Sequence, residues 1–405
     1  MRGIFLILCL IGSLPAWAQQ STISGKVQDR ETGEPLEFAS VGIRGKSEGT
    51  VTNLQGEFDF HFPAEYRNEI LTVNMLGYKT FEAPIWTLLD AGFQTIQMEK
   101  SPTVLEEVTV SDSLSGGDIL RIAFSRIEQN FPMQPFLMDA FYRDVKKVGG
   151  TYISLLETAV QIYDEDYAEP RNKGKLREHV RLIEVRKSLG YESIFTKYFD
   201  QDNLLEDLLL HNNIRYRQIE LREEFYRNMN RDKDSYYNDH PIYVVSHTSD
   251  FRLKFYIDKL DYAIVHMEYE TGYSEDEAGR RKGLISRFAG LKKTIDFRKF
   301  EGKMYLNYIN ITSKVNWYDA KTNELKFESE LFQQLLVNEI HPNTHERIGS
   351  TEKMKNYGLQ YQDQTYNKKF WDNYNVIKET PLDIQIKKDL EKAISLDKQF
   401  KGETN

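Results

Sequence analysis

Residues 25–60 read GKVQDRETGEPLEFASVGIRGKSEGTVTNLQGEFDF, and this stretch decides the fold of the N-terminal part of the chain. Apolar and polar side chains alternate in and around it with the period of two that a half-buried β-strand requires. Turn-forming clusters at 29–35 and 53–56 separate the strands. Working outward, the candidate strands lie at 22–27, 38–43, 57–62, 70–75 and 95–98. The sequence therefore predicts a small β-sandwich over about 80 residues.

The same stretch, with LTVNMLGYKT at 71–80 and MEKSPTVLEEVTV at 98–110, resembles the carboxypeptidase-regulatory-like domain family. The resemblance covers about 21–112 and implies a seven-stranded transthyretin-like β-sandwich, common in cell-envelope proteins of Gram-negative bacteria. Asn53 stands where the family often has Asp, and both side chains make Asx-turns. The positions that carry the resemblance are Gly25, Gly33, Pro35, Gly49, Thr50, Asn53, Gly56, Phe58, Gly77 and Tyr78.

Domains of this family often precede the plug of TonB-dependent outer-membrane receptors, where a similar following segment acts as an energy-coupling strand. An extended segment of this kind binds a partner by strand addition. The alternative is a last sandwich strand that runs into a linker. The rest of the chain is too short for a receptor barrel, so we expect none to follow. The candidate strand-addition segment consists of Val104, Leu105, Glu106, Glu107, Val108, Thr109 and Val110.

The first eighteen residues have the pattern of a secretory signal peptide. Arg2 supplies the positive charge, residues 4–14 are mainly apolar, and 16–18 form a small-x-small cleavage site. We expect cleavage between Ala18 and Gln19. The protein is therefore predicted to be exported, and to be periplasmic or associated with the outer membrane. The single cysteine, Cys9, lies in the segment removed, so no disulfide is expected.

The composition excludes several classes of protein. The 405 residues include 53 Lys and Arg against 62 Asp and Glu, a formal net charge of −9, and 40% are hydrophobic. These values exclude a disordered chain, a collagen-like repeat and a polytopic helical membrane protein. No later segment has the apolar length of a transmembrane helix. The acidic balance argues against a nucleic-acid-binding face.

A linker rich in Pro, Ser and Gly at 101–117 is predicted to divide the sandwich at 19–100 from a second domain at 118–405. Ser115 and Asp118 have the capping-box spacing before an amphipathic helix that Pro132 ends. The second domain is predicted to be α+β with a curved antiparallel sheet, because consecutive hairpins make a meander. Its pattern resembles the half-barrel of lipoprotein-carrier-like periplasmic proteins.

The elements expected in this second domain fall into strands, helices and one exposed loop. Single strands are predicted at 152–163, 179–185 and 242–246. Paired strands flank hairpin turns at 253–257 and 263–269, at 294–300 and 304–311, and at 314–318 and 325–332. Helices are predicted at 193–210 and 383–399, and the exposed loop at 228–240.

Two patterns imitate catalytic motifs. Gly45 to Gly49 match G-x-S-x-G around Ser47, but a nucleophile elbow needs a helix after the serine, and strand-like residues follow here. His341 and His345 have the spacing of a helical zinc pair, but Pro342 between them favours a turn. We interpret both histidines as solvated loop residues, and no catalytic, cofactor-binding or metal-binding residue is predicted.

Two polar patterns and the tryptophans complete the candidates. Residues 164–166, Asp-Glu-Asp, lack the spaced ligands of a calcium loop and are interpreted as a charged strand end. Asn310-Ile-Thr312 is a glycosylation triplet, to which we assign no role in a bacterium. Trp86 and Trp317, with the tyrosine-rich strands, either pack in the core or stack sugars and line a cavity.

The sequence as a whole predicts a non-catalytic, secreted cell-envelope protein. The sandwich is expected to be a docking or ligand-presenting module, and the second domain to bind an apolar or glycan ligand. The expected partner is an outer-membrane or periplasmic protein, and neither nucleic acid nor a cofactor is expected. The alternatives are an envelope hydrolase of peptidase type and an outer-membrane assembly or scaffold protein without a ligand pocket.

Overall fold

The computed structural model of the chain describes most of its residues. The predicted signal peptide with its Ala18–Gln19 cleavage site and the candidate strand-addition segment at 104–110 lie outside the described residues. The described residues are 20–101, 113–192, 195–199, 203–218, 222–354, 359–362, 364–378, 381–392 and 394–402.

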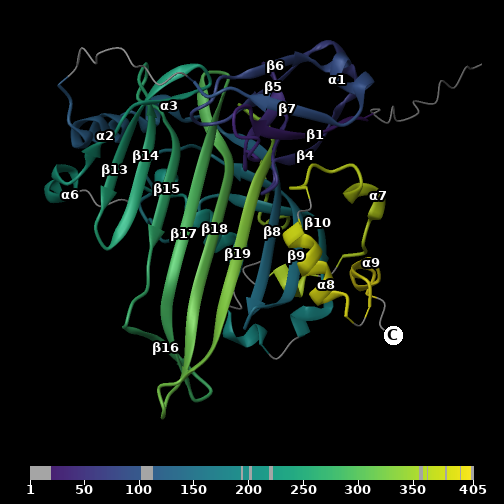
Figure 1. The fold of residues 1–405 in the computed structure, drawn as a ribbon, viewed down its shortest axis with the longest axis vertical. Helices are drawn as coiled ribbons and strands as arrows, with labels where there is room; N and C mark the ends of the chain where they lie inside the picture. The colour runs from purple at the N-terminus through teal and green to yellow at the C-terminus, as the bar shows by residue number, and fades with distance from the viewer. Residues whose placement is uncertain are drawn as a thin grey trace, which may run out of the picture.

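Two small sheets form the N-terminal part, in the orders β4-β1-β7 and β3-β2-β5-β6 (Figure 1). Buried and less buried side chains alternate in β1, β2, β4 and β5, and the three phenylalanines of β4 are fully buried. Apolar residues of both sheets form one shared core, as the alternation in the sequence predicted. The elements are β1 (Gln20–Asp29), β2 (Ser40–Ile43), β3 (Gly49–Val51), β4 (Glu57–Pro63), β5 (Ile70–Asn74), β6 (Phe81–Pro84), α1 (Ile85–Ala91) and β7 (Gln94–Met98).

The predicted turn residues hold this part in register. The Asp29 carboxylate accepts hydrogen bonds from the backbone N–H groups of Glu31 and Thr32, at 2.8 and 2.9 Å. The Asn53 side chain accepts from the N–H groups of Gln55 and Glu57, which is an Asx-turn. Asn53 therefore forms the same turn that is expected of the Asp more common at this position.

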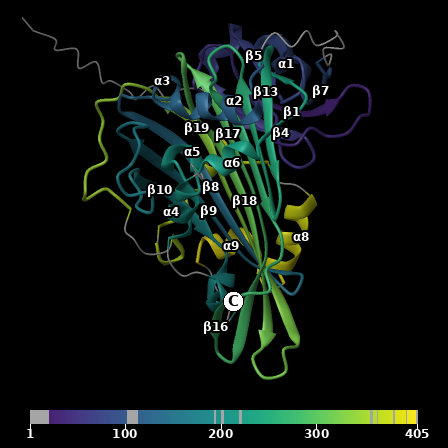
Figure 2. The same cartoon turned by 90° about the vertical axis from the view of Figure 1, so that its left-hand side faces the viewer.

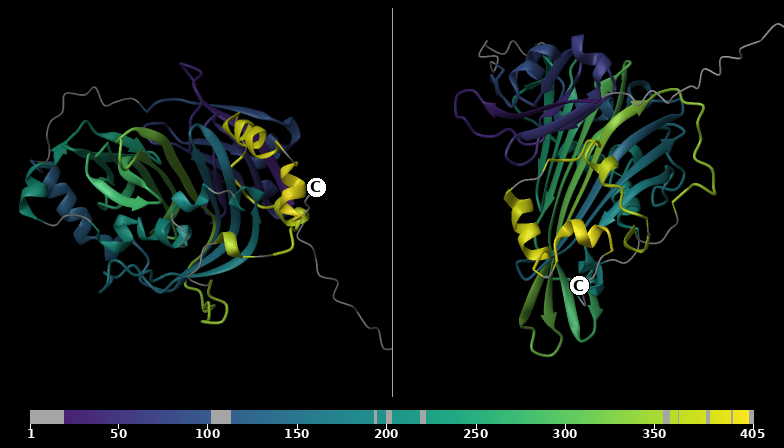
Figure 3. Two further views of the ribbon diagram at one scale, coloured as in Figure 1. Left: turned by 90° about the horizontal axis from the view of Figure 1, so that it is seen from below. Right: turned by 90° about the vertical axis from the view of Figure 1, so that its right-hand side faces the viewer.

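A large antiparallel sheet of twelve strands follows, within the described residues (Figure 1). Its order is β10-β9-β8-β19-β18-β17-β15-β14-β13-β11, with β12 on β13 and β16 on β17. The predicted meander is therefore present, and Figure 3 shows its strands following an arc. The strands are β8 (Phe136–Val148), β9 (Thr151–Asp164), β10 (His179–Lys187), β11 (Asn230–Arg231), β12 (Ser235–Tyr237), β13 (His240–Thr248), β14 (Phe251–Asp258), β15 (Ile264–Thr271), β16 (Glu277–Arg281), β17 (Leu284–Phe300), β18 (Lys303–Asp319) and β19 (Leu325–His341).

The helices between residues 116 and 227 cover one face of this sheet (Figure 2), and the helices after residue 367 pack on the other face. The predicted helix after the linker is present, with the Ser115–Asp118 capping box formed. It begins at Gly116, inside the predicted linker, because Ser115 is its N-cap. Glycine at 117 lets the helix approach the Tyr226 carbonyl oxygen, which a Cβ there would meet at 2.3 Å. The helices are α2 (Gly116–Ser125), α3 (Ile127–Asn130), α4 (Leu204–Leu210), α5 (Asn213–Tyr216), α6 (Glu223–Arg227), α7 (Lys368–Trp371), α8 (Pro381–Leu390) and α9 (Leu396–Phe400).

Several predicted elements differ from the structure. The strands expected at 304–311 and 314–318 are one seventeen-residue strand, β18, because Thr312 and Ser313 between them stay paired with both neighbouring strands. The long helices expected at 193–210 and 383–399 are short ones, α4 in the first range and α8 and α9 in the second. The second domain is therefore mostly β, with few helices, rather than evenly α+β.

The segment predicted as an exposed loop at 228–240 instead contacts the N-terminal part. It contributes β11 and β12 to the edge of the large sheet. The Gly77 N–H donates to the Tyr236 carbonyl at 2.7 Å, and the Thr80 N–H donates to the Asp239 carboxylate at 3.1 Å. The many charged residues of 228–240 led to the prediction that this segment is exposed to solvent. In the structure, polar groups of the segment instead form hydrogen bonds with the N-terminal part.

A polar network lies buried beside the helical face. Arg215, which is fully buried, donates two hydrogen bonds to the Asp164 carboxylate, at 2.6 and 3.0 Å. Asp164 is the last residue of β9, in agreement with the charged strand end predicted from 164–166, and it is buried and ion-paired. The Tyr216 hydroxyl donates to Glu178, which is also buried. Burial, and then the charge of Asp164, raise the pKa of Glu178 to about 7.

The raised pKa of Glu178 predicts a pH-dependent stability. The folded state holds the Glu178 proton more tightly than the unfolded state, so the free energy of unfolding falls as pH rises from about 4.5 to about 7. Glu178→Gln keeps an acceptor for Tyr216 but cannot ionise, so it removes this fall. We compare the free energies of unfolding of variant and wild type by urea denaturation at pH 5 and at pH 8. The difference in favour of the variant should be larger at pH 8 than at pH 5 by up to about 3 kcal/mol. An equal effect at both pH values contradicts the prediction. Glu65→Gln, at an exposed site, is the control.

Candidate functional site

A cleft of about 880 Å³ lies between the N-terminal part and the large sheet. Its roof consists of N-terminal loops at 35–38, 53–54 and 74–76. Its floor is the sheet face opposite the main helical layer, and α8 closes one end with Ile386. Figure 3 shows the N-terminal part and the C-terminal segment on this side of the sheet. This volume is within the range typical of ligand-binding pockets.

The floor is built from rows of residues that run across the strands. Because side chains alternate between the two faces, every second residue of each strand faces the cleft, and the register aligns these residues with those of the neighbouring strand. The middle row is Lys254, Glu268, Thr294, Asn310, Gln334 and Arg143. The next row is Arg252, Glu270, Lys292, Thr312, Phe332 and Val145.

The third row lies at the interface with the N-terminal part. It is Tyr256, His266, Asp296, Tyr308, Leu336 and Phe141. Phe38 of the roof stacks on Tyr308, with ring centroids 5.4 Å apart. This contact closes the cleft along one side, and the polar middle row lies next to it on the floor.

His266 lies between two carboxylates at this side of the cleft and offsets part of their negative charge. Its Nδ1 lies 2.9 Å from Asp296, and its Nε2 lies 3.6 Å from Glu268. Burial alone lowers the pKa of His266, but hydrogen bonding to and the charges of Asp296 and Glu268 outweigh it and raise the pKa to about 9. The imidazole is therefore charged at neutral pH and is held between two carboxylates.

The middle row ends at Arg143 on β8, and this end belongs to a buried network of ion pairs. Arg143 lies 2.6 Å from Glu157, and Arg186 lies 2.5 Å from the same carboxylate. Burial raises the pKa of Glu157, but the charges of Arg186 and Arg143 prevail and lower it to about 2. Arg186 also stacks over Trp371 of α7, at 4.4 Å from the ring centroid. The C-terminal segment is therefore anchored to the sheet at this end.

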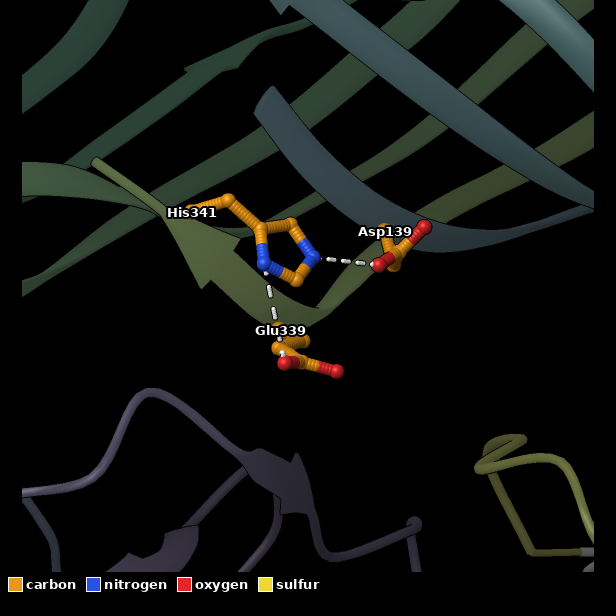
Figure 4. A group of neighbouring side chains, drawn as sticks. All are labelled: Asp139, Glu339 and His341. Atoms are coloured by element: carbon orange, nitrogen blue, oxygen red, sulfur yellow. Dashed lines mark hydrogen bonds and ion pairs between the residues drawn. The ribbon is translucent and has the colours of Figure 1, made fainter. Parts of the chain in front are cut away.

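A second cluster contains His341, Asp139 and Glu339 (Figure 4). His341 Nε2 lies 2.6 Å from Asp139, and Nδ1 lies 3.7 Å from Glu339. His341 thus ends β19 in an ion pair, which corrects its interpretation as a solvated loop residue. His345 is exposed in the loop that follows and is not part of this cluster.

The cluster has a donor set that a transition metal accepts, two carboxylates and an imidazole. Its geometry is nevertheless that of a hydrogen bond, because ligands about 2.0–2.2 Å from a shared ion cannot also bond each other at 2.6 Å. The hydrogen bond with Asp139 raises the pKa of His341, which favours the charged imidazolium of an ion pair. The side chains therefore need to rearrange before they could hold a metal.

The remaining sequence candidates lie apart from one another. Ser47 is in the turn between β2 and β3, so a strand follows it, as expected. Its hydroxyl lies 3.5 Å from the Glu48 carboxylate. Trp86 is exposed on α1, whereas Trp317 is buried and donates to the Ser329 hydroxyl at 2.9 Å. Neither tryptophan lines the cleft.

The residues of the cleft floor were not predicted as site residues from the sequence. Asn310 and Thr312 were noticed only as a glycosylation triplet, yet both line the cleft. The available signal was the polarity of every second residue in one part of β17, Lys292, Thr294 and Asp296, between which Lys293 and Ile295 point to the other face. Such alternation is typical of a solvent-facing sheet and does not by itself reveal a covering domain.

Comparison with known proteins gives one family match. Residues 23–110 match the model of the CarboxypepD_reg-like domain. TonB-dependent receptor SusC of Bacteroides thetaiotaomicron is 33% identical over 110 residues, which is 27% of this chain and 10% of the receptor. TonB-dependent receptor P3 of Formosa agariphila is 30% identical over 110 residues, 26% of this chain and 10% of the receptor. The match thus spans about a tenth of the length of these curated relatives.

Among solved structures, the complex of Pseudomonas aeruginosa MucA and MucB is similar at 10% identity and a TM-score of 0.20. The match covers 56% of this chain and 99% of that one. A putative membrane-associated protein of unknown function from Bacteroides fragilis is similar at 8% identity and a TM-score of 0.16, over 80% and 98% of the two chains. Scores this low carry no argument about function.

The family match agrees with the two small sheets and their shared core. Within the described part of the chain, no helix has both the length and the apolar character needed to cross a bilayer. The matched domain family is typical of Gram-negative envelope proteins. Residues 23–110 of this chain are a CarboxypepD_reg-like domain.

Proposed function

We propose that this protein is an exported, non-catalytic cell-envelope protein that binds an apolar or glycan ligand in the cleft between its CarboxypepD_reg-like domain and its large sheet. The observation that carries the proposal is the cleft itself, at about 880 Å³ and lined from both parts of the chain. The N-terminal domain then presents or encloses the ligand. The segment at 104–110 is proposed to dock an outer-membrane or periplasmic partner by strand addition.

The rival functions have weaker support. A peptidase-type hydrolase needs a nucleophile with a base, or a metal with an activated water. Ser47 lies in a hairpin turn, and the Asp139–His341 contact has hydrogen-bond geometry. A scaffold without a ligand has no use for a cleft whose floor is polar and half-enclosed. The cleft therefore favours ligand binding over both rival functions.

Filling the cleft is the direct test. Asn310 is half-buried in the floor, so Asn310→Trp places a large ring in the space proposed for the ligand. Thr322→Trp, in the exposed turn between β18 and β19, is the matched control. Full-length mature protein is incubated with panels of neutral oligosaccharides, acidic oligosaccharides and fatty acids, and binding is measured by native mass spectrometry. We expect wild type and Thr322→Trp to bind one class, and Asn310→Trp to lose it.

Two outcomes contradict the proposal. Unchanged binding by Asn310→Trp locates the ligand outside the cleft. Failure of wild type to bind any panel favours the scaffold alternative. Circular dichroism and thermal melting establish that each variant is folded.

The His341 cluster gives a second test, of ion pair against metal site. As an ion pair, it stabilises the fold below the ordinary histidine pKa near 6.5, and this contribution is lost as pH rises through the raised value. His341→Ala should therefore lower the melting temperature more at about pH 6 than at about pH 8, with His345→Ala as the control. Added zinc and EDTA should leave the wild-type melting temperature equal. Zinc stabilisation that His341→Ala abolishes would establish a metal site instead.

A further inference from the structure

We infer that the ligand of the cleft is a neutral oligosaccharide that lies across the strands, along the middle row of the floor. This inference rests on the proposed function and narrows it from two ligand classes to one. Three features of the floor carry it: unpaired hydroxyl and amide groups, their spacing, and the balance of charge around them.

The centre of the middle row offers groups that the protein itself does not use. Among the described residues, no side-chain hydrogen bond joins Thr294, Asn310 or Gln334 to another protein group, and all three are half-buried. A hydroxyl and two amides each provide donors and acceptors. Half-buried polar groups of this kind need a partner, either water or a ligand. Sugar hydroxyls, which also both donate and accept, are complementary to them.

The spacing of these groups suits a chain molecule. The middle row passes from Glu268 on β15 to Arg143 on β8 through three intervening strands. Adjacent strands lie ~4.8 Å apart, so the four gaps cover about 19 Å, comparable to about four sugar units in an extended chain. One polar side chain therefore meets each successive unit. An oligosaccharide that runs across the strands can use the whole row.

The charges of the floor point to a neutral ligand rather than an acidic one. Lys254 is paired in register with Glu268, and Glu270 with Lys292, so opposite charges alternate across neighbouring strands. Arg252 also lies 2.8 Å from Glu270. Among the described residues of the floor, each of these cations therefore lies next to a carboxylate residue of the neighbouring strand, and such a mixed row favours an acidic sugar less than a cluster of cations alone would.

The polarity of the row also disfavours a fatty acid or other lipid. An acyl chain over Thr294, Asn310 and Gln334 would remove their hydrogen-bonding groups from water without replacing those bonds. The half-buried rings of Phe38 and Phe332 border the row at the roof and in the next row of the floor. Aromatic rings at these positions can pack against the apolar faces of sugar rings.

The test is the dependence of affinity on chain length. Cello-, xylo-, manno- and malto-oligosaccharides from disaccharide to hexasaccharide are titrated into the full-length mature protein by calorimetry. We expect at least one series to bind, with affinity that rises with each added unit and levels off after about four or five units, when the row is filled. Oligogalacturonate and palmitate serve as acidic and apolar probes and should bind more weakly.

Conservative variants test the row itself. Thr294→Val removes one hydroxyl at nearly constant volume, and Gln334→Ala removes one amide. Each should weaken binding by about threefold to tenfold, as expected for one lost hydrogen bond, and the double variant should weaken it further. Thr322→Val, on the exposed turn, should bind as wild type does. Melting temperatures establish that the variants are folded.

The outcomes separate this inference from the proposed function. Binding of palmitate or oligogalacturonate that Asn310→Trp abolishes overturns the neutral-glycan inference and leaves the ligand-binding function intact. Neutral binding without dependence on length, or unaffected by Thr294→Val and Gln334→Ala, overturns the placement along the row. Absence of binding to every probe counts against both.

Discussion

The alternation of side chains along three seventeen-residue strands is the constraint on which the rest of the structure depends. In β17, β18 and β19 one set of residues packs against the helices, and the other set faces the N-terminal domain. A shift of one residue would exchange the two faces and place Ile295 and Ile309 in the cleft. Irregularities such as the one between Asp296 and Phe297 are therefore accommodated locally, while the rows on either side stay aligned.

The position of the roof depends on the C-terminal segment. The Asn375 side chain both donates to the His61 carbonyl and accepts from the His61 N–H, at 2.9 and 2.8 Å, and so imitates a neighbouring strand at the edge of β4. Lys378 adds an ion pair with Asp59 at 3.0 Å. The same segment reaches the large sheet, where the Tyr374 hydroxyl donates to the Ala140 carbonyl at 3.0 Å. One stretch of chain thus bridges the N-terminal domain and the sheet and fixes the height of the cleft between them.

What the sequence could predict followed from local rules. Asn53, the Ser115–Asp118 capping box and the hairpin turns act within a few residues of themselves, so their outcome did not depend on the rest of the chain. The cleft could not be predicted, because a polar sheet face is covered here by a domain that lies far away in the sequence. The local sequence of the strands does not reveal such a contact. The same limit explains Asp164, whose partner Arg215 lies 51 residues away, and His341, whose partner Asp139 lies 202 residues away. His341 was interpreted as a solvated loop residue and Asp164 as a charged strand end, because neither distant partner is visible in the local sequence.

The energetics of the interface explain why the unpaired groups gather in the middle row. Next to it, at the closed side, His266 is matched by Asp296 and Glu268, and Asp296 is also matched by Asn307 at 2.9 Å. One row away, two amides and a hydroxyl have no hydrogen-bond partner among the described residues, so these groups add no hydrogen-bond stabilisation to the fold. Function is expected at positions where polar groups lack protein partners although the groups around them are paired. The middle row is such a position, and it lies in the cleft of about 880 Å³ that both parts of the chain line.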